Sequence, residues 1–217
     1  MGILMNYIES GDFVGLLLYI LYILLAMCVA ISFHEWAHAF VAYKLGDPTA
    51  KNMGRMTLDP LKHLDPWGFL CFIIFRIGFA KPVIVNSRNL KHFRRDDILI
   101  SLAGPLTNLV LSFIFYGILF FCVYAGVNDY VTDALSYIVI LNVSFAIFNV
   151  LPIPPLDGFH VISSLFVRKS YKVVDILNRY GFIILIAICF TGILDTVLDV
   201  TANGLFDLYN SFFSLFI

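Results

Sequence analysis

The chain has 217 residues, of which 60% are hydrophobic and only 13% carry a charge, with a formal net charge of −1. A soluble domain of this length needs far more polar surface to cover its core, so the composition excludes an ordinary soluble protein. We therefore expect one integral-membrane domain that extends over residues 1–217.

Four long apolar runs indicate how this domain crosses the membrane. A helix needs about 20 apolar residues to cross the hydrocarbon of a bilayer. The runs are close to this length and occupy residues 13–33, 98–124, 134–151 and 181–194. Together with shorter apolar segments, they predict an all-α polytopic membrane protein with about 4–6 transmembrane helices.

The first predicted helix is followed by two shorter segments. Asp12 is a suitable N-cap for this helix, and Gly46-Asp47-Pro48 ends it. Residues 67–80 are short for a crossing and have basic segments on both sides, which favours a re-entrant or surface-lying segment over a short crossing. The β-branched residues at 82–86 lie between proline and asparagine and predict a short β element.

A cluster of prolines interrupts the predicted helix that begins near Ala134. Pro152, Pro154 and Pro155 follow each other too closely for a continuous helix. Because apolar sequence continues on both sides, the chain is expected to break inside the membrane and then resume. Irregular backbone at this depth is tolerated where protein buries it or where it lines a cavity, so the break is a candidate functional site.

The basic residues predict how the helices are oriented. All 14 Lys and Arg residues fall within 44–95 and 168–179, whereas the N-terminus, the turn at 125–133 and the region 195–201 carry only acids. Since Lys and Arg concentrate in cytoplasmic loops, we expect both basic windows in the cytoplasm and the N-terminus outside, in the plasma membrane of a prokaryote. The basic run at 88–95 is typical of a contact with lipid headgroups rather than with nucleic acid.

The sequence His34-Glu35-Trp36-Ala37-His38 matches H-E-x-x-H on the first predicted helix. Positions i and i+4 share a helix face, so both imidazoles can bind one zinc ion while Glu35 reaches a water on that ion. The competing interpretation is a hydrogen-bonded pair of structural histidines beside a buried Glu35. That interpretation is weak, because an uncompensated charge in a bilayer helix costs at least ~2.5–3.5 kcal/mol.

A catalytic zinc site needs a third protein ligand and an open position for water. Asp157 and His160 both lie at the proline break, and Asp157 directly follows the rigid proline segment. Counting the helical rise back from the nearest basic residues puts Asp157 in the same cytoplasmic half of the membrane as His34 and His38. We expect Asp157 to be the third ligand, with His160 as the alternative; a helix N-cap is the competing role for Asp157.

The chain resembles the site-2 proteases in their compact form. The resemblance covers nearly the whole chain and rests on FHEWAH (33–38), GDPTAK (46–51), AKPV (80–83), SLAGPLTN (101–108) and FNVLPIPPLDG (148–158), in that order. It implies a zinc metalloendopeptidase that hydrolyses peptide bonds within or near transmembrane segments of other membrane proteins. It also implies one zinc ion per chain, bound by His34, His38 and Asp157.

The resemblance further implies what the other site residues do. Glu35 is the expected general base, and Asn149 matches an asparagine thought to position the substrate or the oxyanion. The region around 80–83 is expected to hold the substrate in extended form. Phe159 and His160 depart from the pattern, because compact relatives often have a second glycine and then an arginine after the LDG sequence.

Two other functions compete with proteolysis: a metal-binding membrane transporter and a catalytically inactive scaffold of the same fold. A transporter does not explain Glu35 beside His34, and the sequence lacks the repeated halves common in transporters. For Asn108 and Asn142 we expect interhelical hydrogen bonds. The expected partners are the lipid bilayer and a transmembrane protein substrate, and no nucleic acid.

Overall fold

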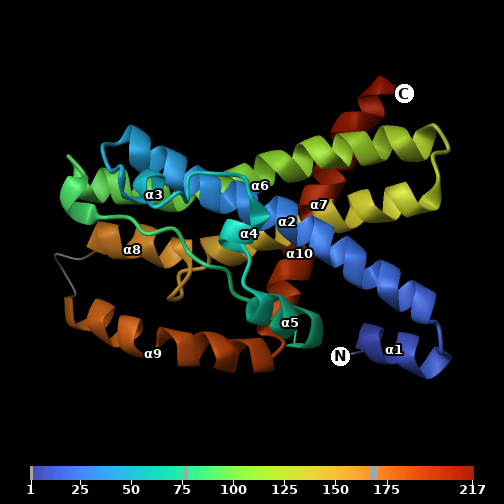
Figure 1. The fold of residues 1–217 in the computed structure, drawn as a ribbon, viewed down its shortest axis with the longest axis horizontal. Coiled ribbons are helices and arrows are strands. Elements are labelled where there is room, and N and C mark those ends of the chain that lie inside the picture. The colour runs from blue at the N-terminus through green and yellow to red at the C-terminus, as the bar shows by residue number, and fades with distance from the viewer. Residues whose placement is uncertain (1, 76–77, 167–170) are drawn as a thin grey trace.

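The computed structural model describes residues 2–75, 78–166 and 171–217, most of which lie in helices (Figure 1). The long helices are α2 (Phe13–Lys44), α6 (Phe93–Tyr124), α7 (Asp129–Val150), α9 (Tyr171–Phe190) and α10 (Ile193–Phe213). The shorter ones are α1 (Gly2–Ser10), α3 (Thr49–Asn52), α4 (Pro60–His63), α5 (Pro66–Phe75) and α8 (Asp157–Phe166), with 3-10 turns at Ser87–Asn89 and Ser214–Phe216. The prediction of an all-α protein is confirmed.

Several of these helices can cross a membrane. In the part of the chain that the structure describes, α2, α6 and α7 are each long and apolar enough to do so. α9 and α10 are bent by 75° from one another at a short break and together make a fourth candidate span. The polytopic membrane protein expected from the apolar runs is therefore confirmed.

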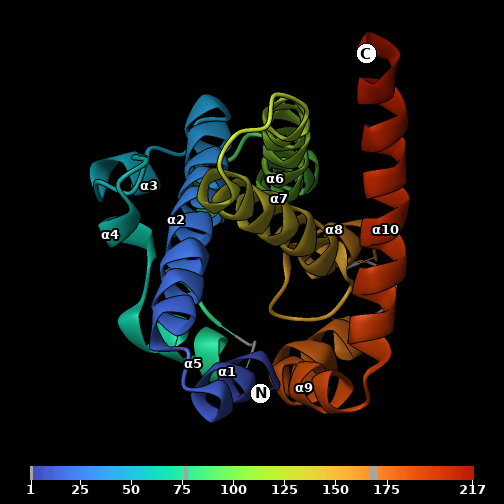
Figure 2. The same ribbon diagram turned by 90° about the vertical axis from the view of Figure 1, so that its right-hand side faces the viewer.

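The core forms where α2 packs against the hairpin of α6 and α7 (Figure 2). Small side chains line the buried face of α2, and Ala26, Ala30 and Ala42 are fully buried there. Small residues let helix backbones approach closely, which is how helices associate in lipid. Asn108 of α6 donates a hydrogen bond of 2.8 Å to Asn142 of α7, which confirms the expected interhelical contact.

The predicted limits of the first helix are confirmed. Asp12 is the N-cap of α2, and its carboxylate accepts a hydrogen bond from the backbone N–H of Gly15 at 2.9 Å. At the other end α2 stops at Lys44, and Gly46 follows with a φ of +111°. A side chain at Gly46 would strain this conformation, so glycine turns the chain sharply out of the helix.

The two ends of the segment that contains α5 are joined to each other by backbone contacts. Leu64 and Ala80 form an isolated antiparallel bridge, and the backbone N–H of Lys81 donates to the carbonyl of His63 at 2.8 Å. Between these points α5 packs against the middle of α2 through Phe69, Phe72 and Ile73. The two ends of the segment thus lie side by side, as expected of a re-entrant segment; residues 76 and 77 of the predicted 67–80 segment lie outside the described residues.

The prediction of a short β element at 82–86 is wrong. Residues 82–86 run as an extended trace between α5 and α6 (Figure 1) but belong to no strand in the structure as described. Two backbone N–H groups there have side-chain acceptors instead: Val83 donates to Glu35, and Asn86 donates to Asp47. A β-branched run supplies the extended conformation, but a strand also needs a partner, and none lies beside it in the described chain.

The predicted break after Leu151 is present. α7 ends there, residues 151–156 run irregularly, and α8 begins at Asp157. Gly158 lies against the backbone oxygens of Val150 and Leu151, where a larger residue would not fit. Ser164 of α8 donates a hydrogen bond to the carboxylate of Asp97 in α6, so the continuation after the break is fixed to the core.

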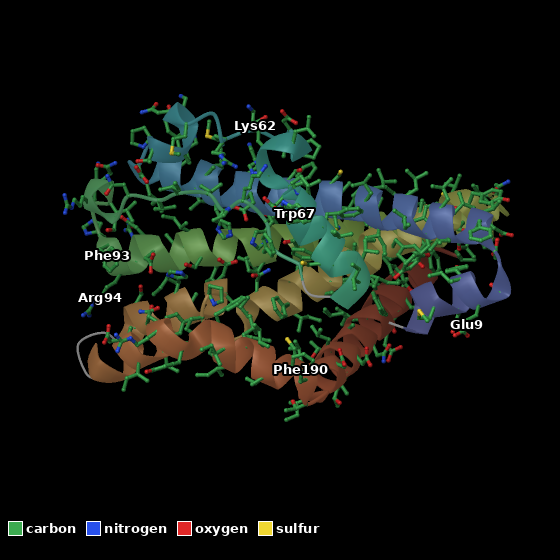
Figure 3. The ribbon with its side chains drawn as sticks, turned by 60° about the horizontal axis from the view of Figure 1, so that its bottom comes forward. Glu9, Lys62, Trp67, Phe93, Arg94 and Phe190 are labelled. Atoms are coloured by element: carbon green, nitrogen blue, oxygen red, sulfur yellow. The ribbon has the colours of Figure 1, made fainter. Side chains whose placement is uncertain are left out.

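The two ends of the bundle carry different charges. α3 and the start of α6 lie at one end, and the turn between α6 and α7 lies at the other (Figure 1). Arg94 and Glu9 likewise lie at opposite ends (Figure 3). Arg168 and Lys169 of the second basic window lie outside the described residues. The end that carries Arg94 is the one expected in the cytoplasm.

Candidate metal centre

Three side chains converge between α2 and the start of α8. His34 and His38 lie one helical turn apart on α2, and their Nε2 atoms are 3.0 Å from each other. Asp157 is the first residue of α8, and its Oδ2 atom lies 3.2 Å from His34 Nε2 and 3.4 Å from His38 Nε2. Both histidines are buried, and the aspartate is mostly buried.

The separations among these atoms fit a zinc ion. Ligand atoms about 2.0 Å from a tetrahedral zinc lie about 3.3 Å from one another, close to the three distances observed. Asp157 Oδ2 is buried and has no hydrogen-bond partner in the described structure. A buried carboxylate oxygen so close to two ring nitrogens is favourable when a cation lies between them. The set of two histidines and one acid matches a known catalytic zinc ligand type.

The outer ring nitrogens of both histidines are also engaged. His34 Nδ1 lies 2.6 Å from Asn108 Oδ1, and His38 Nδ1 lies 2.7 Å from the backbone oxygen of Ile100. Since both partners are acceptors, each Nδ1 carries the proton and each Nε2 presents its lone pair toward Asp157. This is the arrangement in which metal-binding histidines are usually oriented by surrounding groups.

Gly104 of α6 lies directly against the two imidazoles. A Cβ atom at this position would come within 2.5 Å of both His34 Cε1 and His38 Nε2. Glycine is therefore required for α6 to approach α2 closely enough to bring Ile100 and Asn108 to the histidines. Pro105, which follows, is accommodated inside the helix.

Glu35 lies on the same helix and is 9% exposed. Its Oε2 atom accepts a hydrogen bond of 2.9 Å from the backbone N–H of Val83. The extended segment at 82–86 is therefore attached to the carboxylate beside the metal ligands. One carboxylate oxygen is held by the chain itself, which fixes the side chain next to the metal centre.

The far end of that segment is held by Asp47, just beyond α2. The Asp47 carboxylate accepts hydrogen bonds from the backbone N–H groups of Asn86 and Thr49 and from the Asn89 amide, at 2.7 to 3.1 Å. Burial alone would raise the pKa of Asp47, but the hydrogen bonds outweigh burial and hold that pKa below its ordinary value. The contact is therefore ionised at neutral pH and weakens only as the pH falls through this lowered pKa.

The other candidates lie apart from the three ligands. His160 is exposed on α8 and does not belong to the group, so the geometry favours Asp157 over His160. Asn149 is half-buried near the end of α7 and donates to the carbonyl of Phe145 at 3.0 Å. His63 is fully buried in α4 and bonds to the Thr57 carbonyl, away from the centre.

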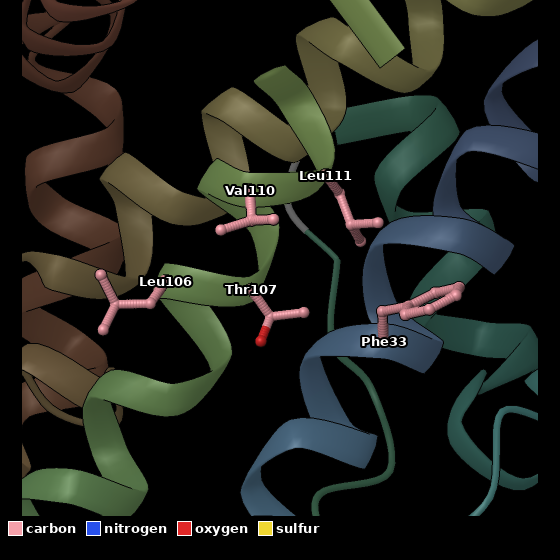
Figure 4. A pocket seen from close by; sticks show the side chains of 5 residues that line it. All are labelled: Phe33, Leu106, Thr107, Val110 and Leu111. Carbon is pink, nitrogen blue, oxygen red and sulfur yellow. The ribbon is translucent and has the colours of Figure 1, made fainter. Parts of the chain in front are cut away.

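An apolar groove lies between α2 and α6. It measures about 330 Å³ and is lined by Phe33 of α2 and by Leu106, Thr107, Val110 and Leu111 of α6 (Figure 4). None of these side chains bears an ionisable group. The groove therefore has an apolar lining, whereas the metal centre consists of ionisable side chains.

Several residues of the centre were not singled out from the sequence. They are Gly104, the Ile100 carbonyl and the Val83 N–H. Their positions at the centre depend on how the helices and the extended segment pack, and no local sequence motif predicts that packing. One signal was available: Gly104 and Asn108 are four residues apart, as are His34 and His38. Two helices with matching faces of this kind can place Gly104 and Asn108 of one helix against the two imidazoles of the other.

Spanning helices with a buried group of two histidines, an aspartate and an adjacent glutamate define a membrane metalloprotease type of centre. The profile of peptidase family M50 matches residues 22–139 and 124–188. The chain belongs to this family, the site-2 protease family, which confirms the resemblance seen in the sequence.

Relatives from bacteria and an archaeon agree with this assignment. "Putative zinc metalloprotease YwhC" of Bacillus subtilis is 38% identical over 176 residues, which cover 78% of this chain and 80% of the relative. "Putative zinc metalloprotease Rip2" of Mycolicibacterium smegmatis is 28% identical over 79% of this chain and 66% of the relative. "Putative zinc metalloprotease MJ0611" of Methanocaldococcus jannaschii is 33% identical over 64% of this chain and 68% of the relative. No solved structure matches the chain.

Proposed function

We propose that this protein is a zinc metalloendopeptidase that hydrolyses peptide bonds within or near transmembrane segments of other membrane proteins. The observation that carries the proposal is the position of the metal-binding group. Its two histidines and Glu35 lie within α2, a helix long and apolar enough to span a membrane. Residues 1–217 act as a single domain in this proposal, with one zinc ion on His34, His38 and Asp157.

The chemistry follows from the ligands and from Glu35. A zinc ion held by His34, His38 and Asp157 would supply a water of lowered pKa and would polarise the scissile carbonyl. Glu35 accepts the proton of the attacking water and later gives it to the leaving amine. The Val83 N–H holds one oxygen of Glu35, which leaves the other free for the water.

Asn149 is the proposed partner of the developing oxyanion. Its amide bonds to the Phe145 carbonyl, so the side chain must turn away from its own helix to meet the substrate. A donor of this kind is worth about 2.7–4 kcal/mol in the transition state. Its place just before the break at 151–156 supports the role, because it adjoins the segment that carries Asp157.

The extended segment at 82–86 is the proposed binding site for the substrate backbone. A helical peptide bond is shielded by its own hydrogen bonds, so the substrate must unwind before cleavage. An extended chain that pairs with 82–86 by strand addition would lie next to Glu35, since Val83 contacts that carboxylate. This accounts for an extended segment that has no strand partner among the described residues.

The competing functions are a metal transporter and an inactive scaffold. A transporter would need bound metal to exchange with both sides of the membrane, whereas Glu35 would have no role. Metal uptake into sealed vesicles that contain the purified protein separates these classes. Uptake without cleavage of any membrane protein would favour the transporter; neither uptake nor cleavage would favour the scaffold.

The decisive experiment compares membrane proteins from cells that carry the wild-type chain or its Glu35→Gln variant. Mass spectrometry should find new termini within or beside transmembrane segments only with the wild-type chain. The substituted glutamine can still accept the Val83 N–H through its amide oxygen, so the fold around the site is preserved. Identical sets of termini in the two samples would contradict the proposal.

We also propose that the protein lies in the plasma membrane of a prokaryote, with the N-terminus outside and the basic segments in the cytoplasm. Single cysteines replacing Asn52, Lys91 and Val127 in a cysteine-free chain provide a test, because all three positions are exposed. An impermeant thiol reagent should label only position 127 on intact cells. Labelling at 91 but not at 52 would mean that residues 67–80 cross the membrane.

A further inference from the structure

A chain of buried amide side chains leads away from the metal centre through three helices. Asn108 of α6 and Asn142 of α7 are both fully buried. Asn108 contacts His34 on α2, and Asn142 contacts Asn108 from the far side. The sequence explained these residues only as contacts between helices, but the contacts end on a metal ligand.

The orientation of the Asn108 amide follows from its neighbours. Its NH2 group has two acceptors: the backbone oxygen of Ala30 at 3.0 Å and Asn142 Oδ1 at 2.8 Å. A flipped amide would place its oxygen against these two oxygens and lose both hydrogen bonds. The NH2 group is therefore fixed, and the Asn108 oxygen must face His34.

Asn142 is oriented in the same way. Its own NH2 group donates to the backbone oxygen of Ile138, one turn earlier in α7, at 2.8 Å. That bond leaves Asn142 Oδ1 pointing at the Asn108 amide. Two backbone carbonyls, of Ala30 and Ile138, thus determine the direction of every hydrogen bond in the chain of amides.

The direction of these bonds decides which nitrogen of His34 carries the proton. Asn108 Oδ1 only accepts, so Nδ1 of His34 must donate across the 2.6 Å contact. Nε2 is then unprotonated and presents its lone pair toward Asp157. His38 obtains the same state from a backbone carbonyl, that of Ile100, whereas His34 depends on a side chain.

We propose that Asn108, oriented by Asn142, is a positioning residue that holds His34 in the tautomer that binds the metal. The inference rests on metal binding by His34 within the proposed function and does not depend on the substrate. A neutral amide suits this position, because a carboxylate in the same place would bring a further charge into the membrane interior. Groups that orient ligand histidines contribute roughly 10–100-fold to metal affinity or activity.

Zinc affinity of the purified protein, measured by competition with a chelator, tests the proposal. Asn108→Leu keeps a similar volume but removes the acceptor, and it should weaken zinc binding by about 10–100-fold. Asn142→Leu leaves Asn108 in place but frees its amide to turn, and it should weaken binding by a smaller factor. Ser112→Ala is the matched control: Ser112 is also a fully buried polar residue of α6, but it bonds to Tyr209 of α10.

The double variant distinguishes positioning from a loss of packing. If Asn142 acts through Asn108, the double Leu variant should bind zinc no more weakly than Asn108→Leu alone. Additive losses would overturn the connection between the two amides. If Asn108→Leu fails to fold, Asn142→Leu still tests the proposal. An unchanged zinc affinity of Asn142→Leu would contradict the role of Asn142 in orienting Asn108.

The outcomes also separate this inference from the proposed function. Zinc affinity that is indifferent to Asn108 and equal to that of the Ser112→Ala control would overturn the inference alone. Dependence on Asn108 in a protein that cleaves no membrane protein would leave the inference standing and contradict proteolysis. Wild-type protein that binds no zinc would overturn both.

Discussion

The helices that carry the proposed metal ligands and the extended segment at 82–86 meet at Glu35, but they are held in different ways. On the helical side His34 and His38 are buried, and each ring has an acceptor on α6. The extended segment is partly exposed and is fixed by the bridge of Ala80 to Leu64 and by the bond of Asn86 to Asp47. Metal ligands need a rigid support, whereas a segment that pairs with a substrate needs accessible backbone.

This difference divides the expected effects of substitution. Changes among the metal-binding helices should alter zinc content, and changes at the extended segment should alter turnover while zinc stays bound. Glu35 lies at the junction and should affect turnover alone. Variants at Asp157 and Asp47 test the two sides of this division, Glu35→Gln tests the junction, and Asn149→Ala tests a residue of α7 outside both regions.

Asp157→Ala should have the largest effect, because it removes one of the three proposed metal ligands and leaves only the two histidines. Purified protein should lose most of its zinc, measured by elemental analysis, and all detectable cleavage. His160→Ala is the control, and it should keep both, since His160 is exposed and outside the ligand group. If Asp157→Ala kept its zinc and His160→Ala lost its zinc, His160 and not Asp157 would be the third ligand.

Glu35→Gln should abolish cleavage while zinc remains at about one ion per chain, because Glu35 is the proposed base and lies outside the ligand group. Loss of a general base reduces the rate by about 10²–10⁴-fold. Zinc content and cleavage of a membrane-protein substrate are measured on the same preparation. Full activity in this variant would remove Glu35 from the mechanism.

Asn149→Ala should keep zinc and lower kcat by about 10²–10³-fold if the amide stabilises the oxyanion. The side chain bonds only to the Phe145 carbonyl of its own helix among the described contacts, so its loss should disturb the fold little. Steady-state kinetics separate this effect from substrate binding. A kcat equal to that of the wild type would exclude Asn149 from the chemistry.

Asp47→Ala tests the extended segment and should have the smallest effect of these variants. It frees the Asn86 end of the segment, and displacement of groups next to the reacting atoms can cost about 10²-fold in rate or less. Zinc should stay bound, and hydrogen exchange should increase at residues 82–86. Asp12→Ala is a matched control, because it removes a capping carboxylate from the other end of α2. A loss of zinc in Asp47→Ala would contradict the division between the two regions.

Much of the centre could be predicted because its residues lie in local patterns. The spacing of His34 and His38 needs only a helix, and the prolines before Asp157 signal the break by covalent geometry. The β element at 82–86 was mispredicted because the residues favour extended backbone, while a strand depends on a partner elsewhere in the chain. The contacts of His38 with Ile100 and of Glu35 with Val83 use backbone atoms, which every residue has, so no residue type marks them.

The close packing at Gly104 means that one added methyl group would disrupt the metal centre. Its Cβ would come within 2.5 Å of both imidazoles, so Gly104→Ala must either push α6 away from α2 or displace the ligands. Such a variant retains every chemical group of the centre and yet holds them in the wrong places. It would serve as an inactive form for capturing uncleaved substrates, because the proposed centre needs empty space at this backbone position as much as it needs its side chains.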